Sequence, residues 1–261
     1  MKIAIIGAGE MGGAFASGLL KGTMFSPDNI TVANPHDDKL QKFAQMGASI
    51  TTDNKTAAQD ADFVALVVKP GVVKTVIDEI ISELDYGKQV IINMAASITI
   101  DQLETWLEKD GAVPEIFQVI PNIGIAERAS MSFIAPNAKG AGNVRKVKDI
   151  FDDLGKSMMT DERLLFAGTA MAGCGIAYVM RFVRAASEAG VELGFKADDA
   201  KEIIVQTMNG AVKLLQGKGH HPETEIDKVT TPGGMTIKGL NAMERHGFSS
   251  AVIEGIKASL V

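Results

Sequence analysis

The stretch from Lys2 to Gly13 reads KIAIIGAGEMGG, and its pattern decides the fold of the chain's first half. A short run dominated by Ile and Ala predicts a strand, and the small residues that follow the stretch have the spacing of a helix. Between them the first glycine permits a tight turn, the second lets backbone approach a pyrophosphate, and the third lets helix pack on strand. The predicted dinucleotide-binding residues are Gly7, Gly9, Glu10, Met11 and Gly12. The alternative is a turn whose glycines serve packing alone.

The composition is that of a soluble globular protein. Of 261 residues, 46% are hydrophobic and 22% are charged, which suffices for one large or two modest domains. A formal net charge of −6 disfavours nucleic acid as a partner, because that requires a basic surface. Cys174 is the single cysteine, so we expect no disulfide framework and no metal site. No stretch approaches the roughly 20 apolar residues of a membrane span, and we expect a cytoplasmic protein.

Strands and helices alternate through the first part of the chain. Strands are expected at 29–34, 48–51, 62–68, 89–94, 116–120 and 130–135, and helices at 37–46, 55–59, 72–84, 100–109 and 143–154. One of these strands is apolar throughout, as is typical of a strand covered on both faces. The alternation predicts an α/β fold with a doubly wound, mostly parallel sheet of Rossmann type. We assign residues 1–160 to this dinucleotide-binding domain.

From about Leu164 onward the sequence changes character. Helical periodicity runs through 165–193, 198–215, 234–245 and 249–260, and no strand is expected there. A small domain with such apolar helices completes its core against another subunit. We assign residues 161–261 to an all-helical domain for substrate binding and dimerisation, and we expect at least a homodimer.

The residue at the end of the second strand indicates which dinucleotide binds. NAD sites place Asp or Glu there, whereas NADP sites avoid a carboxylate and often supply Arg. Here the residue is Asn34, whose amide does not repel a 2′-phosphate. His36 in the same loop either contacts that phosphate or is merely solvated, and Asp37 with Asp38 would oppose the phosphate unless they point away. We predict NADPH as the cofactor, with NADH as the alternative.

Loops after the later strands are expected to complete the cofactor site, because ligands of open α/β sheets bind at the carboxyl ends of the strands. The residues assigned to the site from these loops are Asn54, Val68, Lys69, Pro70, Ala95 and Asn122. Lys69 could equally be a solvated charge, and Pro70 a simple strand stop.

A second glycine-rich helix start lies at Val229–Thr236, which reads VTTPGGMT. A proline fixes the chain before the helix, and Gly233 and Gly234 leave backbone N–H groups unshielded. With the hydroxyls of Thr231 and Thr236, these N–H groups form a site of a size suited to a carboxylate. The alternative is an ordinary capped helix with a glycine hinge.

With these motifs the sequence resembles the pyrroline-5-carboxylate reductases, NAD(P)H-dependent enzymes of the last step of proline synthesis. The resemblance runs nearly end to end and is most specific in Val229–Ile237, which matches VxxPGGxTI. It also includes IGAGEMGGA near the N-terminus, Asn34, Asn54, Val68-Lys69-Pro70, Pro121-Asn122, Gly173-x-Gly175-x-Ala177-Tyr178 and His221-Pro222. The resemblance implies a Rossmann domain followed by a helical dimerisation domain.

The resemblance also implies how the substrate is bound. Reduction of a cyclic imine needs a hydride donor near the C=N carbon, a clamp for the ring carboxylate and a polar partner for the nitrogen. In the family the PGG loop binds the carboxylate, and the threonine that matches Thr236 hydrogen-bonds the imine nitrogen. Thr236 is therefore the implied catalytic residue. The implied substrate-binding residues are Thr231, Gly233, Gly234 and Met235.

The chain departs from the family pattern in several places. Ile123-Gly124 stands for the usual Thr-Pro, Cys174 and Ile176 for Ser and Pro, Thr231 for Ser, and Glu225-Ile226 for Leu-Arg. The departures leave open two alternatives, a reductase of another imine or oxo acid and a non-catalytic paralogue that binds a dinucleotide. A β-hydroxyacid dehydrogenase is disfavoured, because the long helix that begins the second domain lacks the lysine that those enzymes use.

Overall fold

The computed structural model describes residues 1–218 and 221–260. The chain divides into two compact units, Met1–Gly173 and Cys174–Val261, called here the α/β unit and the helical unit. The sequence-based boundary between residues 160 and 161 stays a prediction.

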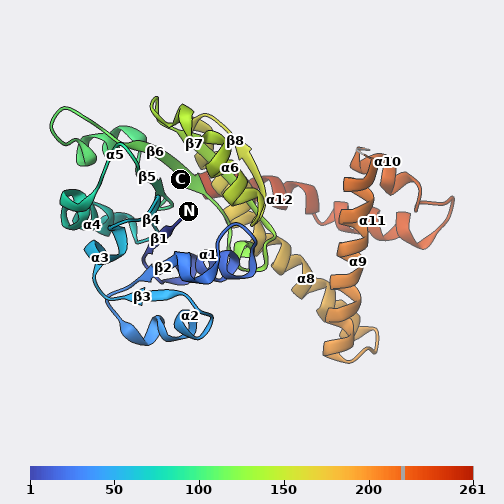
Figure 1. Ribbon diagram of the computed structural model, residues 1–261. Helices are drawn as coiled ribbons and strands as arrows, with labels where there is room; N and C mark the ends of the chain where they lie inside the picture. The colour runs from blue at the N-terminus through green and yellow to red at the C-terminus, as the bar shows by residue number, and fades with distance from the viewer. Residues whose placement is uncertain (219–220, 261) are drawn as a thin grey trace. The chain divides into compact units, whose positions relative to one another are not determined.

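One sheet forms the centre of the α/β unit (Figure 1), with the strand order β3-β2-β1-β4-β5-β6-β7-β8. The strands are β1 (Ile3–Ile6), β2 (Ile30–Ala33), β3 (Ser49–Thr51), β4 (Phe63–Leu66), β5 (Val90–Asn93), β6 (Glu115–Ile120), β7 (Ser130–Pro136) and β8 (Gly155–Met159). Neighbouring strands are parallel except for the antiparallel pair β6 and β7. The predicted doubly wound, mostly parallel sheet is confirmed. The order reverses between β1 and β4, which is the switch point where open α/β sheets bind ligands.

Helices cover both faces of this sheet, because successive residues of a strand point to opposite faces. The helices are α1 (Glu10–Lys21), α2 (Gln41–Gln45), α3 (Asn54–Ala58), α4 (Val73–Ile80), α5 (Ile100–Leu107), α6 (Val144–Asp152) and α7 (Glu162–Gly168). Ile3 belongs to the core under α1 and α6, and its neighbour Ala4 to the core under α3, α4 and α5. In the first core the rings of Phe15 and Phe151 stack with centroids 5.6 Å apart. Each face of the sheet is therefore sealed by this unit's own helices.

Short 3-10 segments connect these elements. They are η1 (Pro27–Asn29), η2 (Asp37–Lys39), η3 (Pro70–Val72), η4 (Ile81–Glu83), η5 (Ile123–Glu127) and η6 (Gly140–Gly142). The segment η5 packs closely on α1, since a Cβ on Gly18 would stand 2.3 Å from the carbonyl oxygen of Ile125.

Asp153 follows α6 and ties η5 to the end of α1. Its carboxylate accepts hydrogen bonds from the Thr23 N–H at 2.8 Å and from Arg128 Nη2 at 2.7 Å. Burial of the carboxyl raises its pKa, but the hydrogen bonds from Thr23 and Met24 and the charge of Arg128 outweigh burial, so the pKa is lowered. Segments far apart in the sequence thereby meet at one ionised side chain.

Three elements of the α/β unit differ from the sequence-based expectation. The helix expected at 72–84 is shorter, because α4 lies between the 3-10 segments η3 and η4. β8 was not expected, because its five residues contain no β-branched side chain and alternate between half-buried and exposed positions at the sheet edge. The single helix expected at 37–46 is instead η2 followed by α2. Leu40, which is fully buried, lies between the two pieces.

The helical unit contains only helices within its described residues. They are α8 (Gly175–Glu192), α9 (Ala197–Lys218), α10 (Pro222–Asp227), α11 (Met235–Arg245), α12 (Phe248–Lys257) and the 3-10 segment η8 (Ala258–Leu260). The predicted all-helical domain is confirmed, although α10 was not expected. α9 approaches α8 closely at Gly190, where a Cβ would stand 2.9 Å from that of Ala200. α12 contacts α8 through the rings of Phe182 and Phe248, whose centroids are 6.4 Å apart.

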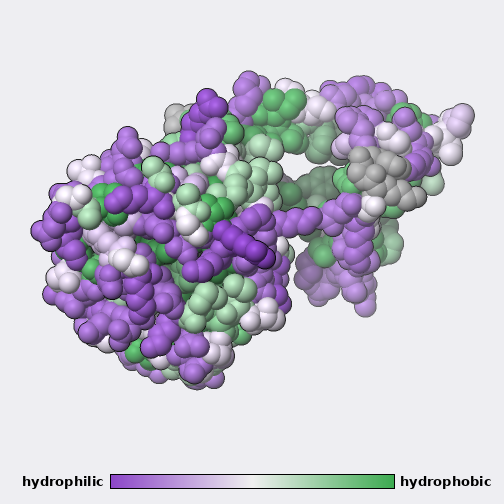
Figure 2. Space-filling model, turned by 45° about the horizontal axis from the view of Figure 1, so that its top comes forward, coloured by the Kyte–Doolittle hydropathy of each residue, from purple (hydrophilic) through white to green (hydrophobic). Residues whose placement is uncertain are grey.

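Much of the helical unit's apolar surface is exposed. Ala200 is the one hydrophobic residue that is buried among those described there. Figure 2 shows green, hydrophobic surface on this unit beside purple, hydrophilic areas. The helical segment Glu162–Glu192, which comprises α7, a π-helical turn (Thr169–Cys174) and α8, is long and apolar enough to cross a membrane by length and composition. The sequence-based expectation that no stretch reaches this length was wrong by that criterion, which core helices of soluble proteins also meet.

Candidate functional site

The glycine-rich turn joins β1 to α1 with almost no free space at two of its glycines. Gly7 has a φ of +108°, and a Cβ there would stand 2.4 Å from the carbonyl oxygen of Val67. A Cβ on Gly12 would stand 1.9 Å from the carbonyl oxygen of Gly7. At Gly9, in contrast, nothing lies within 4 Å of such an atom. The fold therefore forbids side chains at the first and third glycines and leaves open space at the second, where a pyrophosphate approaches the backbone.

The start of α1 is open to an anion. Gly9 is its N-cap, and no side chain accepts a hydrogen bond from the first turn. Free N–H groups at a helix start carry partial positive charge and bind phosphates. Glu10 and Met11 form the first residues of the helix, with Glu10 exposed.

Asn34 holds this turn in place from the end of β2. Its Oδ1 accepts a hydrogen bond from the Ala8 N–H at 3.2 Å, and its Nδ2 donates to the His36 carbonyl at 3.1 Å. The buried amide thus links the glycine turn to the loop after β2. Sequence reasoning assigned Asn34 to the cofactor and missed this structural role, while His36 lies exposed in the loop.

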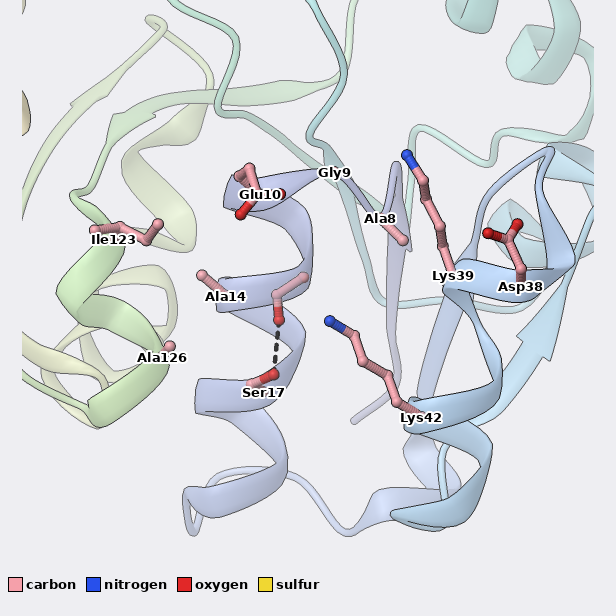
Figure 3. A pocket seen from close by; sticks show the side chains of 11 residues that line it. Ala8, Gly9, Glu10, Ala14, Ser17, Asp38, Lys39, Lys42, Ile123 and Ala126 are labelled. Carbon is pink, nitrogen blue, oxygen red and sulfur yellow. Dashed lines mark hydrogen bonds between the residues drawn. The ribbon is translucent and has the colours of Figure 1, made fainter.

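A cavity of about 510 Å³ follows the outer side of α1 (Figure 3). Its lining comprises Ala8, Gly9, Glu10, Gly13, Ala14 and Ser17 from the turn and α1, Asp38, Lys39 and Lys42 from η2 and α2, and Ile123 and Ala126 from η5. The small side chains of α1 form its floor, and the Ser17 hydroxyl donates back to the Gly13 carbonyl at 2.8 Å. Of the sequence-predicted residues, the cavity brings together Gly9 and Glu10.

Two lysines of this cavity were missed by sequence reasoning. Figure 3 shows Lys39 and Lys42 extending from η2 and α2 on the side of the glycine turn and α1, with the carboxylate of Asp38 on the far side of Lys39 from α1. Within the described chain neither lysine forms an ion pair. Spacing gave no signal for them, because they reach the cavity only through the bend between η2 and α2. They supply positive charge beside the open helix start.

The other predicted cofactor residues follow the strands β3 to β6 and lie outside this cavity's lining. Asn54 begins α3, and its Nδ2 donates to Glu79 Oε2 at 2.7 Å. Val68, Lys69 and Pro70 follow β4, Ala95 follows β5 and Asn122 follows β6. They therefore share the carboxyl edge of the parallel strands, where such sheets bind ligands.

Two of the departures from the family pattern lie in η5 and at the end of the π-helical turn. Ile123 is 43% exposed and lines the cavity from η5, while Asn122 Oδ1 accepts a hydrogen bond from the Gly124 N–H at 2.9 Å. Cys174 is a half-buried free thiol at the end of the π-helical turn. In the part of the chain that the structure describes, no cluster of His, Cys, Asp and Glu could hold a metal ion.

The second glycine-rich helix start, in the helical unit, joins α10 to α11. The Gly234 N–H donates to the Thr231 carbonyl at 2.9 Å, and Gly233 has a φ of +71°. A Cβ on Gly234 would stand 2.6 Å from Thr231 Oγ1. The Thr231 hydroxyl can therefore occupy this position only because residue 234 is a glycine. Met235 is 90% exposed, and no side chain caps α11. The loop thus presents Thr231, Thr236 and open N–H groups to solvent, an arrangement that can bind a carboxylate.

The fold and the open helix start at the switch point define a two-unit protein of the dinucleotide-binding class. A family model described as NADP oxidoreductase, coenzyme F420-dependent, matches residues 2–97. A second, described as pyrroline-5-carboxylate reductase dimerisation, matches residues 162–261. The chain belongs to the pyrroline-5-carboxylate reductase family, because relatives with that name are 34% and 37% identical to it over 98% of its length.

Individual relatives agree with this assignment. The pyrroline-5-carboxylate reductase of Aquifex aeolicus is 34% identical over 98% of this chain and 94% of its own length. Pyrroline-5-carboxylate reductase 1 of Dictyostelium discoideum is 37% identical over 98% of this chain, which spans only 48% of that protein. The crystal structure of Plasmodium falciparum pyrroline carboxylate reductase with NADP bound superposes with a TM-score of 0.88 at 24% identity, covering 100% of this chain and 95% of that one. That last similarity supports the fold.

Proposed function

We propose that this protein reduces L-1-pyrroline-5-carboxylate to L-proline with NADPH. The observation that carries the proposal is the open start of α11, where Thr231 and Gly234 hold a loop with uncapped N–H groups in a member of this family. Such a helix start favours a carboxylate. A substrate with a ring carboxylate beside a C=N bond fits this site.

The α/β unit fits the cofactor. When bound, NADPH supplies the hydride that reduces the C=N bond. Gly9 leaves space for its pyrophosphate beside the uncapped start of α1. Lys39 and Lys42 supply the positive charge that a 2′-phosphate needs, in a loop without the arginine often found in NADP sites. This pair is our reason for proposing NADPH over NADH.

Residues of the loop before α11 and at its start would bind the imine substrate and orient it. The N–H groups at the start of α11 and the Thr231 hydroxyl would hold the carboxylate. The Thr236 hydroxyl would donate a hydrogen bond to the nitrogen as it gains the electron pair of the C=N bond, when the carbon takes up the hydride. A protonated imine, or a proton from solvent, completes the balance without a general acid on the protein.

The helical unit is proposed to pair with a second copy of the chain. Its described residues bury a single hydrophobic side chain, whereas Phe195, Val205 and Leu214 are among many that are exposed. A pairing would cover this surface and also the apolar segment that meets the membrane-span criterion. We propose a homodimer in the cytoplasm, where the unpaired Cys174 suits a reducing compartment.

The test is NADPH consumption by the purified protein with pyrroline-5-carboxylate. The variant Thr236→Ala should lower kcat by roughly ten-fold to a thousand-fold, as the loss of one oriented hydrogen bond does, while Thr236→Ser should retain most of the rate. Thr224→Ala, at an exposed position of α10, is the matched control and should leave the rate unchanged. No turnover in a protein that still binds NADPH would overturn the proposal and favour another cyclic imine or a non-catalytic paralogue.

A further inference from the structure

Two buried amides face each other at the carboxyl end of the sheet. Asn93 ends β5, Gln118 lies within β6, and the two are direct partners in the strand register. Their relative exposures are 0% and 2%. Side chains with unpaired amide groups would be costly at such positions. Apolar residues could fill the same space without this cost. The role of the two amides is therefore indicated by the groups to which they are hydrogen-bonded.

Those partners are each other and the backbone of Ala95. Asn93 Nδ2 donates to Gln118 Oε1 at 2.7 Å and to the Ala95 carbonyl at 3.1 Å. Gln118 Nε2 donates to the same carbonyl at 2.9 Å, and the Ala95 N–H donates to Asn93 Oδ1 at 3.4 Å. Both backbone polar groups of Ala95 are therefore held by side chains from two strands.

The loop that these amides hold is also bent against its local preference. Ser97 has a φ of +65°, a left-handed conformation that costs a residue with a Cβ about 1 kcal/mol. Met94 is fixed by its N–H, which donates to the Leu66 carbonyl at 2.9 Å. The start of the loop is thus tied to β4, β5 and β6 together, while Ala96 and Ser97 are exposed.

The position of this loop matters because of the switch point between β1 and β4. A dinucleotide spans that point, with its pyrophosphate at the glycine turn and one mononucleotide on each half of the sheet. Lys39 and Lys42 lie on the half with β2 and β3. Because these lysines are proposed to bind the 2′-phosphate of the adenosine ribose, the adenosine part of NADPH is assigned to that half. The nicotinamide part then lies over the loops that follow β4, β5 and β6, and Ala95 is in the middle one.

We propose that Asn93 and Gln118 are positioning residues that fix the Ala95 backbone as part of the seat of the nicotinamide ring. The inference rests on the proposed use of NADPH. Neither side chain touches the ring. Their effect is geometric, since hydride transfer requires the reacting atoms within about 3–3.5 Å, and a shift of about 1 Å can cost a hundred-fold in rate.

The chain offers a matched control at the opposite end of β5. Gln89 is 4% exposed, its Nε2 donates to the carbonyls of Ala58 and Ala61 at 2.7 and 2.8 Å, and its Oε1 accepts from the Asp85 N–H at 2.8 Å. It is a similarly buried glutamine that precedes the strand, and its side chain makes three hydrogen bonds where that of Gln118 makes two. Replacing it should lower stability without reaching the cofactor.

The experiment compares Gln118→Met with Gln89→Met, which remove the same hydrogen-bonding group at nearly constant volume. Both should lower Tm. Binding is measured with two probes, NADPH and 2′,5′-ADP, because the second lacks the nicotinamide. We expect Gln118→Met to weaken NADPH binding roughly ten-fold and to slow single-turnover hydride transfer by about ten-fold to a hundred-fold. The affinity for 2′,5′-ADP should be unchanged. Gln89→Met should leave all three unchanged.

Equal effects of the two glutamine variants, or a parallel loss of NADPH and 2′,5′-ADP affinity, would overturn the inference and leave the amides a purely structural role. Should Gln118→Met fail to fold, Asn93→Ser tests the same loop and must show the same selective loss of NADPH affinity. The binding comparison is independent of the substrate. A wild-type protein that binds NADPH but does not reduce pyrroline-5-carboxylate would refute the proposed function. The binding measurements with NADPH and 2′,5′-ADP would still test this inference.

Discussion

The α/β unit and the helical unit differ in where their apolar side chains go. In the first, two cores lie on either side of one sheet, and its own helices seal both. In the second, as far as its residues are described, Ala200 alone is buried among the hydrophobic side chains. The first unit therefore carries its stability within itself, whereas in the second the proposed pairing with another copy of the chain would supply the burial that its own helices do not.

A charge on the exposed apolar surface of the helical unit should break this dependence and give the largest effect. Val205 on α9 is 51% exposed. In a two-fold dimer Val205→Glu buries two carboxylates, at about 2 kcal/mol each, so the dimer dissociation constant should rise about a thousand-fold. Light scattering over a dilution series measures it.

The control for that prediction comes from the other unit. Val72 is 43% exposed in the α/β unit, and Val72→Glu should leave the oligomeric state unchanged. If both variants stay dimeric with unchanged affinity, the exposed surface of α9 is not the surface that the partner covers.

A methyl group in the glycine turn should separate the packing of the α/β unit from its binding of the cofactor. Gly12→Ala places a Cβ 1.9 Å from the Gly7 carbonyl oxygen, and the overpacking should cost about 3 kcal/mol of this unit's unfolding free energy. The Cβ added by Gly9→Ala would meet no atom within 4 Å. This variant should leave stability nearly unchanged and weaken NADPH binding instead. Urea unfolding and NADPH titration of both variants separate the effects. Equal loss of stability in the two variants would contradict this division between packing and binding.

The smallest expected effect concerns cofactor preference, which we place in the α/β unit alone. Lys39→Gln and Lys42→Gln should each weaken NADPH by about five-fold to ten-fold, as the loss of one exposed charge contact does, and leave NADH unchanged. Lys201→Gln removes a cation that pairs with Asp198 in the helical unit at 3.8 Å, and it should change neither. Titrations with both cofactors measure this, and a uniform loss for NADPH and NADH would refute the role of the two lysines.

The sequence predicted those features that a single segment encodes. The glycine turn at Gly7 to Gly12 and the PGG loop before α11 each carry their geometry in a few adjacent residues, and the alternation of apolar strands with helices marked the sheet. The family resemblance added the role of Thr236, which stays a prediction.

Features that depend on distant partners could not be predicted in this way. β8 exists because β7 offers it an edge, although its own residues do not favour a strand. Lys42 reaches the cavity through a bend after β2, and Gln118 meets Asn93 only through the register of β5 and β6. Asn34 bonds to Ala8 across 26 positions of sequence. Each of these contacts is fixed by tertiary packing, which a reading of local patterns does not contain.

The hydrogen bonds of Asp153 to Thr23 and Arg128 set the order in which the parts of the cofactor site form during synthesis. Thr23, at the end of α1, precedes the carboxylate that binds it by 130 residues. At about 5–20 residues per second of synthesis, roughly 6 to 26 s pass before its partner is made. During that interval the nascent chain already carries the glycine turn, but for most of it the chain still lacks η5, which lines the cavity opposite η2 and α2 and begins roughly 100 residues after Thr23. A growing chain therefore makes its dinucleotide motif long before it can close the cavity around it, and cofactor capture belongs to the finished α/β unit.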